Sequence, residues 1–436
     1  MSAAARVPLD PLETRDPQGR ERELLAALPR QIALAKEQTA AYAEILRDVA
    51  PHAVTCRTTL GAVPVTRKHE LLARQRAWAG VDPFGGFSVV GWPRLHSARR
   101  ARRVFQSPGP MYEPEAYRTD YWRMGRALRA AGFEDGDLVH NSFSYHLTPA
   151  GSMLETGANA IGCTVFAAGT GNTEHQLQAL VDLAPDGYVG TPSFLRVLLE
   201  KADEAKVCVK SLRKALVSGE AFPAALRDWL RGRGIEAYQA YATADVGSIA
   251  YETQAREGLV VDEGVLVEIV RPDTGEPVAH GEVGEVVVTT FNPDYPLIRL
   301  ATGDLSAVLP GACPTGRTNL RLKGWMGRTD QLTKVRGMFV HPSQVADVIR
   351  DFPHVRKARL VVAADMARDE MTLQVETHDV PEGLADALVD GLRRITKLRG
   401  AVVVMAPGTL PDDGKVIEDR RGAPLLHPFD TRRSHE

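Results

Sequence analysis

The sequence contains few cysteines and almost no excess charge of either sign. Its cysteines, Cys56, Cys163, Cys208 and Cys313, lie far apart and form no CxxC pair. Such spacing provides neither a disulfide framework nor a complete thiolate metal site. The 53 lysines and arginines nearly balance the 55 aspartates and glutamates, and the net charge is −2. Composition therefore favours neither a nucleic-acid partner nor an anionic membrane.

The sequence also has no long apolar segment. No stretch approaches the ~20 apolar residues that a membrane-spanning helix needs, and residues 1–23 contain no uninterrupted apolar run of the signal-peptide kind. We therefore expect a cytoplasmic protein with no membrane partner. The 436 residues, of which 44% are hydrophobic, are enough for two or three domains, each with a core of its own.

The order of helical and strand patterns predicts an α/β fold with two domains. Apolar positions at helical spacing in residues 20–49 predict two helices that are separated by a break at Pro29. Strand and helix patterns alternate over residues 117–241, which favours a parallel sheet covered by helices. We expect a large N-terminal domain, residues 1–329, in which β-rich segments after residue 257 add an antiparallel subdomain. A small α+β domain, residues 330–436, follows.

Three polar segments in the C-terminal half carry residues suited to binding and catalysis. The segment PLIRLATGDL places Asp304 after an apolar strand, where its carboxylate could accept hydrogen bonds from two neighbouring hydroxyls. The segment GRTDQLTKVRGMFV contains Arg328, Asp330 and Gly337, and LPDDGK places Lys415 after a glycine in a polar loop. Taken singly, these segments are more typical of a turn, a charged hairpin and a solvated lysine.

Taken together, in this order and spacing, the three segments resemble the phenylacetate–coenzyme A ligase family of acyl-adenylate-forming enzymes. The resemblance covers roughly residues 42–419. It implies a large N-terminal domain that holds ATP and a carboxylic acid, and a small mobile C-terminal domain that moves between two half-reactions. Further matching segments are RLHS (94–97), GDLVHNSFSYHLTPAG (136–151), GTPSFL (190–195), VSGEAF (217–222) and YQAYATADVG (238–247).

The resemblance implies that a carboxylate attacks the α-phosphate of ATP, pyrophosphate leaves, and the thiol of coenzyme A then displaces AMP. We expect activation of an aromatic or hydrophobic carboxylic acid, with ATP, magnesium and coenzyme A as cofactors and a homodimer as the assembly. Two alternatives are a relative that binds nucleotide or acyl-adenylate without turning over ATP, and an enzyme that transfers the acyl group to a carrier protein or an amine.

The resemblance also assigns roles to residues in the three polar segments. Lys415 is expected to bridge the acyl carboxylate and the α-phosphate, because two anions can react only when cations neutralise the developing charge. Asp304 is expected to hold the ribose hydroxyls, with Arg328 beside them. Asp330 corresponds to the hinge between the two domain positions. Gly337 matches a loop that would face coenzyme A.

Further assignments concern the base and the acyl group. Tyr241 is expected to stack on adenine. For the acyl group, an aromatic side chain in a flat apolar pocket would suit an arene, although a tyrosine buried in the core is an equally good interpretation of Tyr145. The remaining residues assigned in this way are Gly219, Glu220 and Ala221, whose backbone would line the base, and His146 and Ala242 near the acyl group.

The sequence departs from the family at the phosphate loop. The family has a loop rich in serine, threonine and glycine after RxHxS, and its backbone N–H groups hold phosphates. Here ARRARRVFQ follows, with arginines 99, 100, 102 and 103. Arg99, Arg100, Arg102 and Arg103 could supply charge in place of backbone donors, because guanidinium pairs well with phosphate. The alternatives are loss of the triphosphate site, which leaves a solvated basic turn, and a less favoured nucleic-acid patch.

Two further departures concern metals. Asp245 stands where the family has a glutamate, and its shorter carboxylate is expected to bind magnesium, directly or through water, as a catalytic ligand. The family's CxCGRT segment contains only one cysteine here, Cys313, with Thr315 in the second place and Thr253 at another position where a cysteine often stands. One thiolate cannot hold a four-coordinate zinc ion, so we expect no structural zinc.

Overall fold

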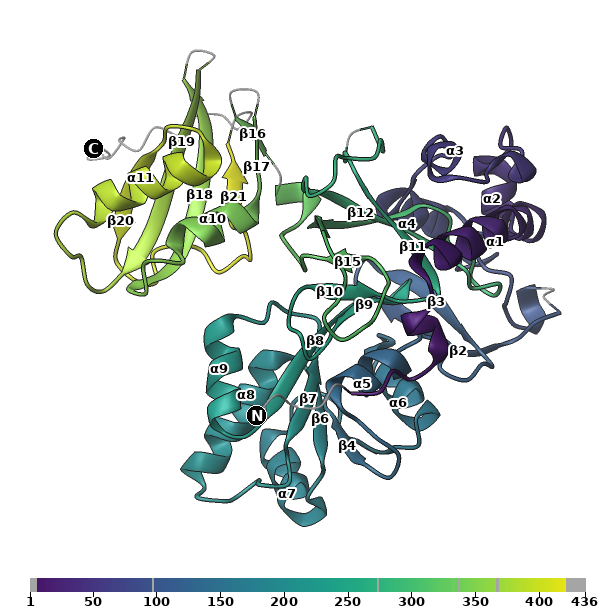
Figure 1. Cartoon of the computed structure of the whole chain (residues 1–436), viewed down its shortest axis with the longest axis horizontal. Coiled ribbons are helices and arrows are strands. Elements are labelled where there is room, and N and C mark those ends of the chain that lie inside the picture. The colour runs from purple at the N-terminus through teal and green to yellow at the C-terminus, as the bar shows by residue number, and fades with distance from the viewer. Residues whose placement is uncertain are drawn as a thin grey trace, which may run out of the picture. The chain divides into compact units, whose positions relative to one another are not determined.

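The computed structural model describes residues 6–95, 98–272, 274–331, 333–335, 338–365 and 368–420. The chain divides into two compact units, Met1–Trp325 and Met326–Glu436. Figure 1 shows helices on the faces of several sheets in the first unit and a smaller mixture of helices and strands in the second. The predicted α/β fold class is therefore confirmed.

The centre of the first unit is a nine-stranded sheet with the order β14-β15-β10-β9-β8-β7-β6-β4-β5. Its parallel part consists of β4 (Leu138–Asn141), β5 (Thr164–Ala167), β6 (Gly187–Gly190), β7 (Lys214–Val217) and β8 (Glu236–Thr243). Its antiparallel part consists of β9 (Gly247–Glu252), β10 (Leu259–Val261), β14 (Val308–Leu309) and β15 (Arg321–Leu322). The alternating pattern over residues 117–241 corresponds to the parallel part, and β10, β14 and β15 come from the β-rich region after residue 257.

Amphipathic helices connect the parallel strands, because each such connection must cross a face of the sheet. In α8 (Pro192–Glu204), the Thr191 side chain caps the first turn, Pro192 suits the first helical position, and leucines at helical spacing are buried. The other helices in this part are α5 (Gly125–Ala131), α6 (Ala150–Ala160), α7 (Thr173–Leu183) and α9 (Ala224–Gly232).

A second, four-stranded sheet has the order β1-β13-β12-β11. Its strands are β1 (Thr66–Arg67), β11 (Val265–Val270), β12 (Gly284–Thr290) and β13 (Leu300–Ser306), and only the β1–β13 pairing is parallel. The N-terminal helices belong to this part of the unit: α1 (Pro17–Gln38), α2 (Ala40–Ile45), α3 (Arg57–Gly61) and α4 (Lys68–Ala77). Short 3-10 helices occur at Pro11–Thr14, Pro51–Ala53, Pro93–Leu95 and Thr329–Gln331.

The predicted break at Pro29 is wrong. Pro29 lies inside the 22-residue α1, and the chain leaves the helix only at Thr39, which caps α2. A proline inside a helix removes one backbone hydrogen bond and costs about 3 kcal/mol. Burial of a continuous apolar stripe that includes Leu28 and Ile32 offsets this cost, since each such side chain contributes roughly 1.5 to 3 kcal/mol.

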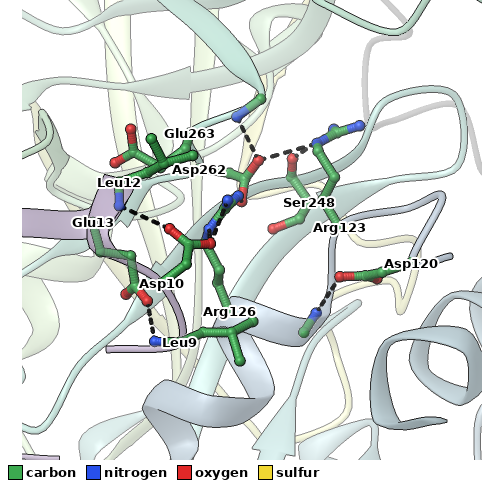
Figure 2. A network of polar contacts seen from close by, with 12 residues as sticks. Leu9, Asp10, Leu12, Glu13, Asp120, Arg123, Arg126, Ser248, Asp262 and Glu263 are labelled. Atoms are coloured by element: carbon green, nitrogen blue, oxygen red, sulfur yellow. Dashed lines mark hydrogen bonds and ion pairs between the residues drawn. The ribbon is translucent and has the colours of Figure 1, made fainter. Parts of the chain in front are cut away.

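The segment before the first helix is held to the first unit by ion pairs, as Figure 2 shows. Arg126 on α5 lies 2.7 Å from the Asp10 carboxylate and 3.2 Å from that of Asp262, which also pairs with Arg123. The Asp10 side chain accepts a hydrogen bond from the backbone N–H of Leu12. These contacts join the N-terminal segment to the central sheet.

Arg299 links several separate segments of the first unit. Its side chain is 1% exposed, and its Nε and Nη2 each lie 3.0 Å from an oxygen of Glu268 on β11. Its other N–H groups donate to the carbonyls of Gly61, Val63 and Gly275. Arg299 therefore fixes the start of β13 against β11 and against the segment that leads into β1.

The second unit is an α+β body with a four-stranded sheet of order β20-β19-β18-β21. Its helices α10 (Pro342–Ile349) and α11 (Leu384–Thr396) bury leucines and valines in one core with the sheet. Its strands are β16 (Thr333–Val335), β17 (Met338–Val340), β18 (Val355–Asp365), β19 (Arg368–Thr377), β20 (Ala401–Met405) and β21 (Ile417–Asp419). Across the described residues, no helix has the length and apolar character needed to cross a bilayer.

We expect Arg299→Met to lower the free energy of unfolding by about 3 to 5 kcal/mol, because it leaves the buried Glu268 carboxylate and several carbonyls without their donor. Urea unfolding followed by tryptophan fluorescence measures the change. Arg196→Met is the matched control, since Arg196 is exposed on α8 and forms an ion pair with Glu200, four residues further on the same helix. A change below about 1 kcal/mol for both variants would show that Arg299 does not organise the unit.

Candidate active site

A cavity of about 130 Å³ opens at the carboxyl ends of the parallel strands, where open α/β sheets bind ligands. Its walls come from segments that follow β4, β7 and β8, from α6, and from the turn between β2 (Ala101–Ser107) and β3 (Met111–Ala116). The walls are mainly apolar. Their residues include Ser107, Pro108, Met124, Phe143, Met153, Leu154, Ser218, Gly219, Ala242, Thr243 and Ala244.

The structure brings Tyr241 and Asp304 together, while their roles at a nucleotide stay predictions. The Tyr241 hydroxyl donates a hydrogen bond of 2.9 Å to the Asp304 carboxylate, and burial together with this negative charge raises the pKa of the tyrosine. Trp325 donates from its indole N–H to the other carboxylate oxygen of Asp304 at 3.2 Å. Sequence reasoning missed Trp325, because a tryptophan 21 residues beyond Asp304 carries no signal of this contact.

Asp304 lies within β13, where the pairing with β12 contains an irregularity in register. Gly303 has a φ of +79°, which favours glycine, and its N–H donates to Glu285. The Thr302 hydroxyl accepts from the N–H of Asp304 and donates to the carbonyl of Val286 on β12. Thr302, Gly303 and Asp304 thus form an irregular part of β13 rather than the turn expected after a strand; hydrogen bonds to β12 hold it, and Asp304 is 8% exposed.

The segment predicted to line the base follows β7. Gly219 lies on the cavity wall with a φ of +83°, and Glu220 and Ala221 after it are exposed. The Ser218 hydroxyl donates to the carbonyl of Ala240 on β8, so this segment is tied to the strand that carries Tyr241. Backbone groups of the segment are therefore accessible beside Tyr241's strand.

Of the three residues predicted near the acyl group, the cavity wall includes Ala242. Tyr145 is half-buried, and its hydroxyl accepts a hydrogen bond from the side chain of Asn141. His146 is exposed. Roles for Tyr145 and His146 at the substrate stay predictions. Phe143 and Met153 line the cavity instead, and the apolar character of NSFSYHLTPAGSML is the only sequence signal for them.

The arginine-rich segment forms much of β2 and meets acidic residues of the same unit. Arg102 and Arg103 approach Glu115 on β3, at 3.8 and 3.3 Å, and Arg99 lies 3.4 Å from Asp294. Arg100 is exposed. The cavity wall includes Ser107, the last residue of this strand, and Pro108 after it. Among the described residues that line the cavity, none is one of these four arginines. Phosphate binding by these arginines stays a prediction.

Asp245 follows Thr243 and Ala244, two residues of the cavity wall, and the donors around its carboxylate gather at Oδ1, while Oδ2 has no hydrogen-bond partner among the described residues. The Lys68 ammonium lies 3.0 Å from Oδ2, while Oδ1 accepts from the Thr243 hydroxyl and the Val246 N–H. Burial opposes ionisation of Asp245, but Lys68 and Thr243 outweigh it, so its pKa is lowered. Because an ammonium lies beside both carboxylate oxygens, the residues present disfavour direct ligation of magnesium by Asp245, and binding through water stays a prediction.

Glu113 on β3 is a second buried carboxyl group in this region. Ser107, which lines the cavity, donates its hydroxyl to one oxygen of Glu113. Burial, reinforced by the charge of Asp245, raises the pKa of Glu113 to about 8, although the Ser107 hydrogen bond and Lys68 act in the opposite direction. Glu113 is therefore mostly protonated at neutral pH. Sequence reasoning did not single it out, because only burial distinguishes it from a surface glutamate.

The second unit contains Lys415 in an exposed loop, and the buried Arg359 forms ion pairs with residues on either side of it. The Arg359 guanidinium is 3% exposed and pairs with Asp413 and Glu418, which flank Lys415. Arg328 and Asp330 lie 3.8 Å apart near the start of this unit. Gly337 lies outside the described residues, so its predicted contact with coenzyme A has no structural account.

Cys313, Thr315 and Thr253, which stand where family members carry cysteines for a structural zinc, lie close together. The Cys313 thiol is 3.1 Å from the Thr315 hydroxyl and 3.4 Å from that of Thr253. Two hydroxyls thus stand beside the one thiol. Within the described ranges, no group of three or more histidine, cysteine, aspartate or glutamate residues is arranged to hold a metal ion.

Comparisons with known proteins identify relatives of this chain. A family model described as "AMP-binding enzyme" matches residues 122–292. The chain is 31% identical to a phenylacetate-coenzyme A ligase of Thermus thermophilus over 396 residues, which is 85% of this chain and 86% of that protein. It is 32% identical to the enzyme of the same name from Aromatoleum evansii over 312 residues, 68% of this chain and 69% of that one.

The fold matches solved acyl-coenzyme A ligases. A crystal structure of an open conformation of 2-hydroxyisobutyryl-CoA ligase, in complex with 2-HIB-AMP and CoA, superposes with a TM-score of 0.79 over 94% of this chain and 93% of that chain. The sequence identity is 22%. The anthranilate CoA ligase AuaEII aligns with a TM-score of 0.51 and 18% identity over 72% of this chain and 63% of that chain.

The raised pKa of Glu113 makes the free energy of unfolding depend on pH. Below about pH 4.5 the carboxyl is protonated in both states, whereas between pH 4.5 and 8 the unfolded chain releases a proton that the folded protein keeps. The free energy of unfolding that Glu113 contributes is therefore lost progressively between pH 4.5 and 8, by up to about 1.4 kcal/mol per pH unit, and is gone once the pH has risen through 8. We expect the free energy of unfolding of Glu113→Gln to rise relative to that of the wild-type protein between pH 5 and 8.

Urea unfolding at pH 5, 6, 7 and 8 measures this difference. Glu37→Gln is the control, because Glu37 is exposed near the end of α1. Parallel stability profiles for the wild-type protein and Glu113→Gln would contradict the raised pKa of Glu113.

Proposed function

Because the chain belongs to the phenylacetate–coenzyme A ligase family, we propose that it is an ATP-dependent, AMP-forming ligase that joins an aromatic or hydrophobic carboxylic acid to coenzyme A. The observation that carries this proposal is the apolar cavity at the carboxyl ends of the parallel strands, beside the hydrogen-bonded pair Tyr241 and Asp304. The cavity suits an uncharged hydrocarbon group, and the pair suits the ribose and base of a nucleotide.

The proposed reaction has two steps. A carboxylate oxygen of the acid attacks the α-phosphorus of ATP, and the bond to pyrophosphate breaks, which gives an acyl-adenylate. The sulfur of coenzyme A, after loss of its proton, then attacks the acyl carbon, and AMP leaves with the electron pair of the broken C–O bond. No base is needed in the first step, because a carboxylic acid is already ionised at neutral pH.

In this proposal the first unit binds the nucleotide and the acid. Asp304 accepts hydrogen bonds from the ribose hydroxyls, Tyr241 stacks on adenine, and the backbone at residues 219–221 lines the base. Phe143 and Met153 surround the hydrocarbon part of the acid. ATP enters as its magnesium complex, so the metal belongs to the substrate.

The second unit supplies Lys415 to the first step. Its ammonium neutralises charge between the acyl carboxylate and the α-phosphate, where a single positioned donor commonly contributes 10²- to 10³-fold in rate, roughly 3 to 4 kcal/mol. Arg359 supports this role, because it neutralises Asp413 and Glu418 on either side of the lysine. Asp330, near the start of the unit, serves as the hinge in the same proposal.

The family relationship favours ligase activity over the two alternatives. The relatives with at least 30% identity are ligases named for coenzyme A, which supports a turnover enzyme with that acceptor. No relative supports a protein that only binds nucleotide, or an enzyme that transfers to a carrier protein or an amine. The homodimer and the cytoplasmic location stay predictions.

We expect purified protein to release pyrophosphate from MgATP only when an aryl or bulky alkyl carboxylic acid is present, and to form the thioester when coenzyme A is added. Lys415→Ala should slow pyrophosphate release by roughly 100-fold or more, because the positioned charge is lost. Lys210→Ala, at an exposed lysine of the first unit, is the control. Equal rates for Lys415→Ala and the wild-type protein would remove Lys415 from the reaction.

Asp304→Asn should weaken AMP binding by roughly 10- to 100-fold, because a hydrogen bond to a charged acceptor contributes roughly 1.5 to 3 kcal/mol. Isothermal titration calorimetry measures the affinity. Asp182→Asn, at an exposed aspartate on α7, should bind AMP as the wild-type protein does. Unchanged affinity in Asp304→Asn would place the ribose elsewhere.

Met153→Ala should shift preference towards larger acids, with roughly a tenfold change in the ratio of kcat/KM values, because removal of methylene groups enlarges the hydrophobic pocket. The measurement is pyrophosphate release with a series of acids of increasing size. Leu198→Ala creates a comparable cavity in the core beneath α8 and controls for lost stability. If both variants keep the wild-type order of preference, Met153 does not contact the acid.

A further inference from the structure

The ion pair between Lys68 and Asp245 lies at the edge of the candidate site and takes no part in the reaction proposed above. Lys68 is the first residue of α4, directly after β1, and β1 pairs with β13, the strand of Asp304. Asp245 follows the cavity residues Thr243 and Ala244. The pairing of β1 with β13 therefore brings a lysine from early in the sequence to the carboxylate after β8.

The Lys68 ammonium lies beside both oxygens of the Asp245 carboxylate, although Oδ2 has no hydrogen-bond partner among the described residues. The Asp245 side chain is 2% exposed, and the Lys68 ammonium lies 3.0 Å from Oδ2 and 3.4 Å from Oδ1. Oδ1 also accepts from Thr243 and from the N–H of Val246. Magnesium needs six oxygen ligands close to octahedral geometry, and an ammonium at hydrogen-bond distance would repel it.

The neighbouring Glu113 does not restore a metal site. It is 1% exposed, and its Oε1 accepts a hydrogen bond from Ser107 while its Oε2 is a buried oxygen without a hydrogen-bond partner among the described residues. A carboxylate with an unpartnered buried oxygen is costly, whereas a neutral carboxyl is much less so. The region thus contains one negative charge, on Asp245, and one positive charge, on Lys68.

We propose that the Lys68 ammonium is the permanent counter-ion of Asp245, and that the protein acquires a divalent ion only together with the phosphates of its nucleotide. The first part depends on the ion pair alone. The second part rests on the proposed function, because there the nucleotide is the substrate. Lys68 is in this view a positioning residue that orients Asp245 and, through it, Thr243 on the cavity wall.

Manganese titration without nucleotide, followed by the electron paramagnetic resonance signal of free Mn²⁺, tests the first part directly. The wild-type protein and Lys68→Arg should bind no stoichiometric Mn²⁺. Lys68→Ala should bind one ion at least about tenfold more tightly, because the carboxylate loses its competing cation. The double variant Lys68→Ala/Asp245→Asn should return to the wild-type behaviour.

Two results would overturn the proposal. One is stoichiometric Mn²⁺ binding by the wild-type protein that Asp245→Asn abolishes. The other is a folded Lys68→Ala that binds no more Mn²⁺ than the wild-type protein does.

A second measurement applies if Lys68→Ala does not fold. At constant ATP, the Mg²⁺ concentration that half-saturates pyrophosphate release should differ by less than about twofold between the wild-type protein and Asp245→Asn, whereas loss of a true metal ligand would raise it at least about tenfold. The latter result would also overturn the proposal. Failure of the proposed function would appear differently, as absence of pyrophosphate release in the wild-type protein, and would leave the Mn²⁺ titration informative.

Discussion

The buried guanidinium of Arg299 is the interaction on which the first unit depends. It joins Glu268 on β11 to the carbonyls of Gly61 and Val63, just before β1, and it stands directly before β13. Arg299 thus anchors both β13, which carries Asp304, and the segment before β1, which Lys68 follows. An arginine buried with all of these partners also limits movement of β13 relative to β1, because any shift would expose several hydrogen bonds at once.

Charges in and around the site are compensated locally. Arg102 and Arg103 meet Glu115, Arg99 meets Asp294, Lys68 meets Asp245, and Arg359 neutralises the acids beside Lys415. A buried or half-buried charge is stable only with such a partner. Three of the four arginines of the arginine-rich segment are therefore paired with acidic residues of the same unit.

Much of the architecture could be predicted from hydrophobic patterns, because a strand that must be buried and a helix that must cover it have different periods. Pro29 shows where such reasoning fails. Local propensity predicts a break there, but the stripe of leucine and isoleucine that packs beneath α1 contributes more free energy than the lost backbone hydrogen bond costs. At the site, Tyr241 and Asp304 could be paired through the family resemblance, whereas Trp325, Phe143 and Met153 could not, since their contacts depend on the path of distant segments.

The sequence by itself determined the fold class and the family, because these follow from local spacing and from motifs of consecutive residues. Only the tertiary structure decided which charges meet. Lys68 and Asp245 are 177 residues apart, and Glu113 acquires its raised pKa only when β3 is buried beside them. The physical reason is that electrostatic interaction and desolvation depend on distances in space, which the pairing of β1 with β13 sets and the order of residues does not reveal.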